Sequence, residues 1–165
     1  MMENLNWDWK AAISISIALS ALLITVIQTH LTRKHNKLSI RPVLCDWVHT
    51  TDNRITFWIM NKGLGTADIS AFNFYIYDKK ATLEEFQQDV NEQVKQNSII
   101  VDTAGMSANS YLAKDEKVTV LDVTFQKDIN IDDSFIKHLD DRYKITIKYK
   151  SLYGDCFNYK SGLRI

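Results

Sequence analysis

The residue types that most often carry chemistry are sparse in this chain of 165 residues. Its histidines and cysteines are His30, His35, His49, His138, Cys45 and Cys156. None of them has the H-x-x-x-H, H-E-x-x-H or Cys-x-x-Cys spacing that lets neighbouring side chains hold one metal ion. No Gly-x-Ser-x-Gly sequence is present to hold a serine nucleophile on a sharp turn. We therefore expect no enzyme, no metal site and no cofactor.

Two acidic pairs keep one alternative open. Asp132-Asp133 and Asp140-Asp141 flank a short apolar segment, and carboxylate oxygens are the ligands that hard divalent cations prefer. The simpler interpretation is that the first pair caps a helix and the second lies in a solvated loop. The alternative function is accordingly a membrane-tethered enzyme, or a divalent-ion-binding domain, with a site built from scattered acidic residues.

A glycine loop lies in the stretch Ile59–Ile69, IMNKGLGTADI. A dinucleotide fingerprint, G-x-G-x-x-G, requires a third glycine where this chain has Asp68, and it requires a helix afterwards. The next residues alternate as a strand does, and the Gly-Lys-Ser/Thr of a P-loop is also missing. We therefore interpret Asn61, Gly63 and Gly65 as a structural turn between two strands, with both glycines at positive φ and Asn61 bonded locally.

A basic face is predicted near the C-terminus. Lys144, Lys148 and Lys150 share one side of a predicted strand, and Lys160 falls on the adjoining hairpin strand. The simpler interpretation is a solvated face that protects a sheet edge from aggregation. The alternative is a surface for an acidic partner or for the anionic membrane surface.

Charge is spread unevenly although the formal net charge is zero. From Pro42 to Ile165, 18 Asp and Glu residues outnumber 15 Lys and Arg residues. Nucleic-acid-binding domains are typically basic. We therefore expect no nucleic-acid partner.

The N-terminal region carries the strongest signal. Residues 11–31, AAISISIALSALLITVIQTHL, have no formal charge, and a helix of about 20 such residues crosses roughly 30 Å of hydrocarbon. A cleaved signal peptide would have a basic start, a shorter core and a small-residue cleavage site, and a buried soluble helix is the remaining alternative. We expect a short flank at 1–10, a transmembrane helix at 11–31, a basic juxtamembrane linker at 32–41 and a soluble domain at 42–165.

The basic residues predict the orientation of this span. Arg33, Lys34, Lys37 and Arg41 follow it, whereas Lys10 alone precedes it. Because basic flanks stay in the cytoplasm, we expect a single-pass protein of the bacterial inner membrane with its C-terminal domain in the cytoplasm. The two cysteines are too few for a disulfide framework, and we interpret them as reduced core residues.

The span also carries small residues at regular spacing. Ala12, Ser16 and Ser20 recur every fourth residue, a ridge that lets two helix backbones approach closely. The simpler explanation is chance, because small residues are common in spans. The ridge nevertheless makes these residues candidates for a helix–helix contact in a homo-oligomer.

Beyond the span, apolar residues alternate with period two, which predicts strands. The expected strands are Val43–Thr50, Arg54–Asn61, Ala67–Asp78, Ile99–Val101, Lys117–Gln126, Arg142–Ser151 and Cys156–Lys160. A capping box at Thr82–Glu85 predicts a helix that ends near Gln96, and a second short helix is expected over Asp132–Asp140. The fold class is therefore mainly β: a transmembrane helix, then an antiparallel, immunoglobulin-like β-sandwich with one or two inserted helices.

Two turn motifs give the chain a family resemblance. Asn61, Gly63, Gly65 and Ala67 form N-x-G-x-G-x-A after a strand, and Tyr149, Ser151, Gly154 and Phe157 form a second pattern near the C-terminus. With the Arg41-Pro42 junction, they resemble small, largely uncharacterised bacterial membrane proteins with one N-terminal span and a β-sandwich domain. Thr66 departs from the small or proline residue usual there, and Ser151 from a usual acidic residue. The resemblance implies a fold and no activity.

The function expected from these features is a non-catalytic, membrane-anchored protein-interaction module. Its partners are the membrane and a protein of unknown identity, and bacterial envelope or phage-defence assemblies are suitable contexts. The anchor would fix the sandwich at the inner face of the membrane, where it binds another protein or itself.

Overall fold

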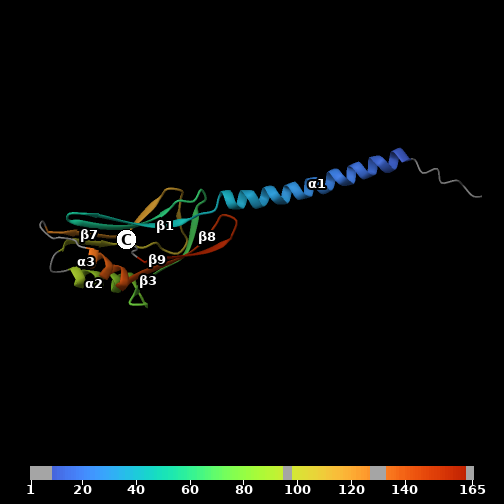
Figure 1. Ribbon diagram of the computed structural model, residues 1–165. Coiled ribbons are helices and arrows are strands. Elements are labelled where there is room, and N and C mark those ends of the chain that lie inside the picture. The colour runs from blue at the N-terminus through green and yellow to red at the C-terminus, as the bar shows by residue number, and fades with distance from the viewer. Residues whose placement is uncertain (1–8, 95–97, 127–132, 163–165) are drawn as a thin grey trace, which may run out of the picture. The chain divides into compact units, whose positions relative to one another are not determined.

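The structure is a computed structural model that describes residues 9–94, 98–126 and 133–162. The chain divides into two units, Met1–Ser39 and Ile40–Ile165. The first unit contains one long helix and the second contains a β-sandwich (Figure 1).

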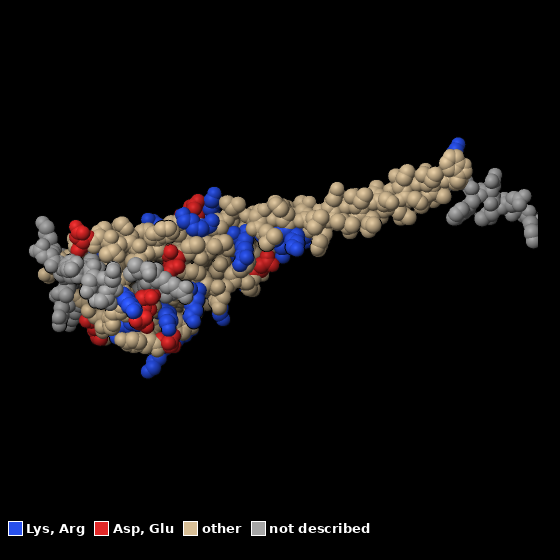
Figure 2. All heavy atoms as spheres, viewed as in Figure 1, with Lys and Arg blue, Asp and Glu red and all other residues tan. Residues whose placement is uncertain are grey.

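Helix α1 (Trp9–Ser39) is the element of the first unit that is long and apolar enough to cross a membrane. Its most apolar window has a mean hydropathy of 2.2, and none of that window is buried against protein. Charged side chains along α1 are confined to its two ends (Figure 2). The helix continues past the predicted span through most of the basic segment 32–41, so Arg33, Lys34 and Lys37 lie on its last turns.

The serine and threonine side chains of α1 bond to the helix itself. Ser16 Oγ donates to the carbonyl of Ala12 at 2.9 Å, and Ser20 Oγ donates to the carbonyl of Ser16 at 2.8 Å. Thr25 and Thr29 make the same bond to the fourth residue before them. These bonds satisfy the hydroxyl protons in an apolar environment, which makes the residues tolerable in a span.

The second unit is an antiparallel β-sandwich of two sheets. One sheet has the strand order β1-β2-β7-β5, and the other has β4-β3-β8-β9 with β6 also paired to β3. The strands are β1 (Leu44–Thr51), β2 (Arg54–Asn61), β3 (Ala67–Ile76), β4 (Lys79–Ala81), β5 (Ser98–Thr103), β6 (Ser110–Leu112), β7 (Lys117–Phe125), β8 (Tyr143–Lys150) and β9 (Cys156–Gly162). In chain order, β1-β2-β7-β5 and β3-β8-β9 correspond to the ABED and CFG sheets of immunoglobulin-type sandwiches.

The core lies between the two sheets and confirms the predicted alternation. Ile55, Phe57 and Ile59 of β2 are each 1% exposed. They belong to one hydrophobic cluster with residues from the opposite sheet, including Ile145 and Ile147 of β8. Since each strand presents every second side chain to this cluster, the polar residues between them face outward.

Two bulges change which residues face the core. In β3 the register shifts between Ile69 and Ala71, so the inward positions change from odd to even numbers. In β7, Thr119 pairs with Trp58 and Leu121 with Phe57. Val120 is therefore the extra residue and is fully buried next to Leu121. Bulges of this kind bend and twist a strand locally.

Two helices connect the sheets, as predicted. Helix α2 (Leu83–Val94) begins with the predicted capping box: Thr82 N donates to Glu85 Oε2 at 2.8 Å, and Glu85 N donates to Thr82 Oγ1 at 3.1 Å. Phe86 and Val90 are buried, and each burial contributes about 2 kcal/mol. Helix α3 (Asp133–Arg142) buries Ile136 and Leu139.

Sequence periodicity missed two short strands, β4 and β6, which each have three residues. A two-residue turn, Tyr77-Asp78, connects β3 to β4, and both residues have positive φ, at 45° and 66°. This turn type normally favours Asn-Gly. Here the Tyr77 hydroxyl accepts a hydrogen bond from Arg142 and the Asp78 carboxylate accepts one from Lys144, so side-chain bonds hold the turn.

Candidate functional site

The glycine loop lies between β2 and β3 and packs against the first residues of the sandwich unit. A Cβ atom on Gly65 would lie 1.7 Å from the carbonyl oxygen of Ile40, and one on Gly63 would lie 2.2 Å from that of Arg41. Neither glycine has a positive φ. The predicted reason for the glycines was therefore wrong: they are needed because another backbone segment lies against them.

Asn61 is the centre of this contact and is fully buried. Its Oδ1 accepts hydrogen bonds from the amides of Val43 and Gly63, at 3.1 and 3.0 Å. Its Nδ2 donates to the carbonyls of Gly65 and Leu112, at 2.7 and 3.0 Å. All four hydrogen-bonding positions of the amide are used by backbone groups, so Asn61 has a structural role and no capacity for a ligand.

Arg41 belongs to this junction and not to a free basic flank. Its guanidinium lies 4.6 Å from the ring centre of Phe157 on β9, within the range of a cation–π contact. Pro42, which follows it, is buried. Of the four residues predicted to orient the span, Arg33, Lys34 and Lys37 lie on α1, and Arg41 lies on the sandwich.

The residues considered for metal or acid–base chemistry are not brought together. Within residues 9–94, 98–126 and 133–162, no group of three His, Cys, Asp or Glu side chains could hold a metal ion. His49 and His138 are exposed. Asp132 lies outside the described residues, as does the side chain of Asp133. Cys45 and Cys156 are free thiols. Cys45 is half-buried and Cys156 is exposed, so the expectation that both are core residues was wrong.

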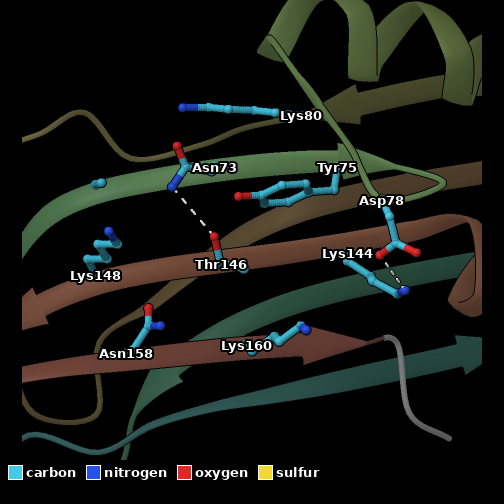
Figure 3. Close-up of a pocket in the computed structure, with 10 residues that line it drawn as sticks. Asn73, Tyr75, Asp78, Lys80, Lys144, Thr146, Lys148, Asn158 and Lys160 are labelled. Carbon is cyan, nitrogen blue, oxygen red and sulfur yellow. Dashed lines mark hydrogen bonds and ion pairs between the residues drawn. The ribbon is translucent and has the colours of Figure 1, made fainter.

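Three of the four lysines of the predicted basic face line a hollow on the outer side of the β4-β3-β8-β9 sheet (Figure 3). This lysine hollow has a volume of about 550 Å³. Its lysines are Lys80 from β4, Lys144 and Lys148 from β8, and Lys160 from β9. Asn73, Tyr75, Thr146, Asn158, Ala71 and Asp78 complete the lining. The sequence predicted three of these lysines, whereas Lys80 was missed because β4 was missed.

The sheet register explains why these side chains meet. Tyr75 of β3 pairs with Lys80 on one side and with Lys144 on the other. Thr146 pairs with Asn73 on one side and with Lys160 on the other. Directly paired residues point to the same face of a sheet, so these two rows of polar residues line the outer face.

Among the described residues, Asp78 provides the single carboxylate of the lysine hollow. It accepts a bond from Lys144 Nζ at 2.7 Å, and this hydrogen bond lowers the pKa of the Asp78 carboxyl below its ordinary value. Lys80, Lys148 and Lys160 have no ion pair in the part of the chain that the structure describes. The lysine hollow therefore has an excess of positive charge in a domain that is acidic as a whole.

Lys150 lies outside the lysine hollow. It lines a neighbouring hollow of about 350 Å³ together with Tyr149, Cys156 and Phe157. Lys148 and Asn158 line both hollows. The four predicted lysines thus share one sheet face but divide between two depressions.

The outer face of the other sheet carries exposed tryptophan. Trp47 of β1 and Trp58 of β2 are directly paired, and Trp47 is 59% exposed. Cys45 and Met60 form the next outward-facing pair. Lys117 Nζ lies 4.8 Å from the ring centre of Trp58. We call Trp47, Trp58, Met60 and Cys45 the tryptophan face; the strand pattern in the sequence did not indicate it.

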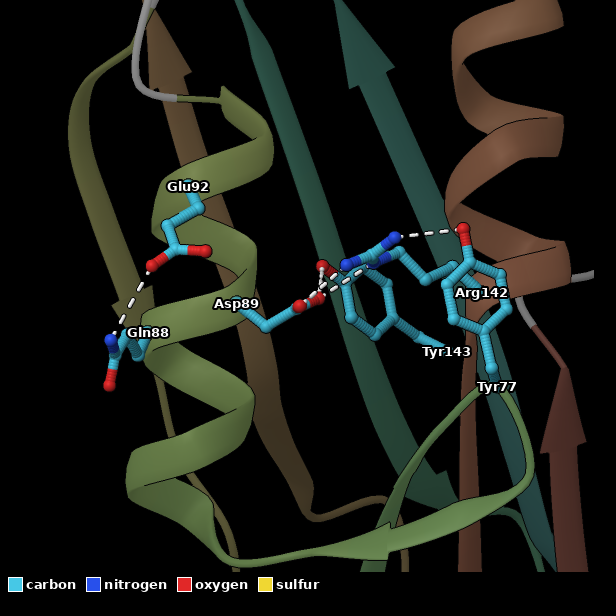
Figure 4. Close-up of polar contacts among 6 residues, drawn as sticks. All are labelled: Tyr77, Gln88, Asp89, Glu92, Arg142 and Tyr143. Carbon is cyan, nitrogen blue, oxygen red and sulfur yellow. Dashed lines mark hydrogen bonds and ion pairs between the residues drawn. The ribbon is translucent and has the colours of Figure 1, made fainter.

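A polar cluster links the two helices and stabilises the fold (Figure 4). Arg142 at the end of α3 donates two hydrogen bonds to the Asp89 carboxylate of α2, at 2.7 and 2.5 Å. The Tyr143 hydroxyl donates to the same carboxylate at 2.7 Å. The bond from Arg142 lowers the pKa of Asp89, and burial raises the pKa of Tyr143. With its acceptors occupied from inside the protein, the cluster is structural.

Comparisons with known proteins identify the family of this chain. No curated protein matches the sequence significantly. Among solved structures, the archaellum periplasmic stator protein FlaG from Sulfolobus acidocaldarius is similar at 12% identity and a TM-score of 0.24, over 73% of this chain and all of that one. Agreement this low carries no inference about function. A family model matches residues 9–163, nearly the whole chain, and the protein therefore belongs to the family described as a domain of unknown function, DUF8453.

Proposed function

We propose that the protein is a membrane-anchored, non-catalytic interaction module whose sandwich binds a protein partner. The proposed location is the bacterial inner membrane, with the sandwich in the cytoplasm and a role as a subunit of an envelope or phage-defence assembly. The resemblance to uncharacterised single-span bacterial proteins and the basic end of α1 support this location.

The observation that carries the proposal is the tryptophan face. Trp47 is 59% exposed on a regular strand, where its side chain contributes nothing to the core between the sheets. Tryptophan and methionine are enriched in the centres of protein interfaces, and tryptophan is among the residues that dominate their binding energy. A large exposed aromatic residue next to further apolar side chains is therefore typical of a docking surface.

Polar groups border this face and indicate the partner's chemistry. Lys117 covers one side of Trp58, and Arg54 forms an ion pair with Asp122 farther along the same sheet. An apolar centre with a polar rim is the usual anatomy of a protein interface. The partner is expected to present an apolar patch to Trp47 and an acidic or polar edge to Lys117.

Site-specific photo-cross-linking in native membranes tests the proposal. A benzophenone amino acid replaces Trp47 in the full chain, and the matched control carries it at Tyr111, which is 61% exposed on β6. We expect a protein adduct of one defined mass at position 47, its loss with Trp58→Ala, and no such adduct at position 111. Lipid adducts alone, or equal labelling at both positions, would contradict the proposal.

Direct binding then decides whether the adduct is specific. The cross-linked protein, identified by mass spectrometry and purified, should bind the full chain in nanodiscs. Trp47→Ala should raise the dissociation constant about tenfold or more, and Tyr111→Ala should leave it unchanged. If Trp47→Ala and Tyr111→Ala change the dissociation constant equally, the tryptophan face is not the interface.

A further inference from the structure

We propose that the lysine hollow binds an anionic ligand that carries two or more phosphate groups. The proposal goes beyond the proposed function, because it concerns the opposite sheet and does not require a protein partner. It rests on the charge, the donor chemistry, the spacing and the size of the lysine hollow.

The first argument is the charge that is left unneutralised. Four lysines line the lysine hollow, and its one carboxylate, Asp78, is bonded to Lys144. The nearby charge of Lys160 also contributes to the lowered pKa of Asp78. Three lysines without an ion pair among the described residues thus line one depression, and its described lining has a single acid, which creates a positive potential that attracts anions.

The second argument is the type of donor. Among the described residues, the lining contains lysine and no arginine. The planar fork of arginine matches carboxylate and phosphate alike, whereas lysine is a compact point charge with three rotatable donors that also binds phosphate. A set of ammonium groups accommodates the tetrahedral oxygens of phosphate without a preferred plane, so the chemistry of this lining suits phosphate groups.

The third argument is the spacing between the lysines. Lys144 and Lys148 are four residues apart on one strand, about 13 Å along β8. Lys80 and Lys144 are two strands apart, both in register with Tyr75, which separates their backbones by about 10 Å. These lysines are therefore spread along β8 and across the sheet, and a ligand with two or more anionic groups can engage more of them at once than a single phosphate can.

The fourth argument is the floor between the lysines. Asn73 Nδ2 makes one long bond, of 3.5 Å, to Thr146 Oγ1. The Tyr75 hydroxyl and the side-chain amide of Asn158 make no hydrogen bond to the described residues. Neutral donors therefore remain available among the residues that line the lysine hollow (Figure 3). A volume of about 550 Å³ is within the usual range of small-molecule sites, roughly 300–1,000 Å³.

The test measures tripolyphosphate binding to the full chain in phosphatidylcholine nanodiscs by calorimetry. The test variant is Lys80→Gln with Lys148→Gln and Lys160→Gln. The matched control is Lys62→Gln with Lys114→Gln and Lys137→Gln, which removes the same charge from exposed positions elsewhere. We expect the test variant to weaken binding about tenfold or more and the control to change it less than about twofold.

Two further arms identify the source of the phosphate. Inorganic phosphate tests whether one group suffices, and we expect it to bind much more weakly than tripolyphosphate. Phosphatidylcholine vesicles with cardiolipin, whose headgroup has two phosphates, should compete with tripolyphosphate if the natural source is a lipid. If they do not compete, the source is a soluble phosphate compound.

Two results would overturn the proposal: no tripolyphosphate binding at millimolar concentration, or equal weakening in both triple variants, which indicates a general charge effect. Trp47→Ala should leave tripolyphosphate binding unchanged. Failure of the protein-partner proposal and failure of the phosphate proposal are therefore distinguishable.

Discussion

The side-chain oxygen of Asn61 lies 3.1 Å from the amide nitrogen of Val43. This bond ties the end of β2 to the residue that precedes β1, and the Lys62 amide donates to the Val43 carbonyl at 2.8 Å beside it. Ile40 and Arg41 pass close over Gly65 and Gly63 in the same region. The first residues of the sandwich unit are therefore part of its packed structure and not a free linker.

Removal of the Asn61 amide should destabilise the sandwich strongly. Asn61→Ala leaves two amides and two carbonyls without the partners that they have now, and the expected loss is about 2–4 kcal/mol of unfolding free energy. Asn158→Ala, on the exposed outer face, should change it by less than about 0.5 kcal/mol. Chemical denaturation followed by tryptophan fluorescence measures both, and equal effects would show that the Asn61 bonds contribute little.

Local sequence patterns predicted the elements whose cause is local. The strands around Ile55, Phe57 and Ile59 follow from alternation, and α2 follows from the bonds between Thr82 and Glu85. Both signals operate within a few residues of the chain. The first and last residues of the predicted strands and helices of the sandwich unit therefore agree with the structure to within two residues.

The rest depends on contacts between distant segments. The need for Gly65 comes from Ile40, and β4 exists because Lys79–Ala81 pairs with β3. The lysine hollow requires four strands in register, so the sequence indicated a basic strand face but not its depth or Lys80. Trp58 was recognised only as an alternating strand residue, because nothing local identifies its partner, Trp47.

The ion pair between Asp89 and Arg142 should make stability depend on pH in the acid range. Arg142 lowers the pKa of Asp89 in the folded protein. A carboxyl with a depressed folded pKa contributes stability that is complete above its unfolded pKa of about 4 and is lost as the pH falls through the folded value. Asp89→Asn removes this contribution, because an amide cannot form the charged pair.

Thermal unfolding of the natural protein and of Asp89→Asn, measured between pH 7 and pH 2.5, tests this pH dependence. At pH 5–7 the melting temperature of Asp89→Asn should lie below that of the natural protein by a constant amount. This difference should shrink below about pH 4. Asp78→Asn, which breaks an exposed ion pair with Lys144, should lower the melting temperature much less. A difference that does not change across the acid range would mean that the charge of Asp89 is not the cause.

The orientation of the span should respond to the basic residues at the end of α1. Replacing Arg33, Lys34 and Lys37 with glutamate should weaken or invert the orientation, because basic flanks are retained in the cytoplasm. The same replacement at Lys62, Lys114 and Lys137 changes the charge of the sandwich equally and should leave the orientation unchanged. Reporters fused to the C-terminus, one active only in the cytoplasm and one only in the periplasm, measure the result. A working periplasmic fusion of the unmodified protein would refute the cytoplasmic location.

The last prediction concerns self-association through α1. Ala12, Ser16 and Ser20 lie one above another on one side of the helix, since residues four apart share a face. Ser16 and Ser20 donate their hydroxyl protons to their own helix, so these protons are not available across an interface. A contact between two copies would therefore depend on close approach of the backbones over small side chains.

Leucine at these positions blocks that approach without adding charge. Ser16→Leu with Ser20→Leu should reduce cross-linking between copies in native membranes about fivefold, which corresponds to roughly 1 kcal/mol of association free energy. Ile13→Leu with Ile17→Leu changes bulky residues elsewhere on the helix and should leave cross-linking unchanged. If the serine variant cross-links as well as the natural chain, α1 serves as an anchor alone, and association between copies would then have to use the sandwich, where the tryptophan face is the first surface to substitute.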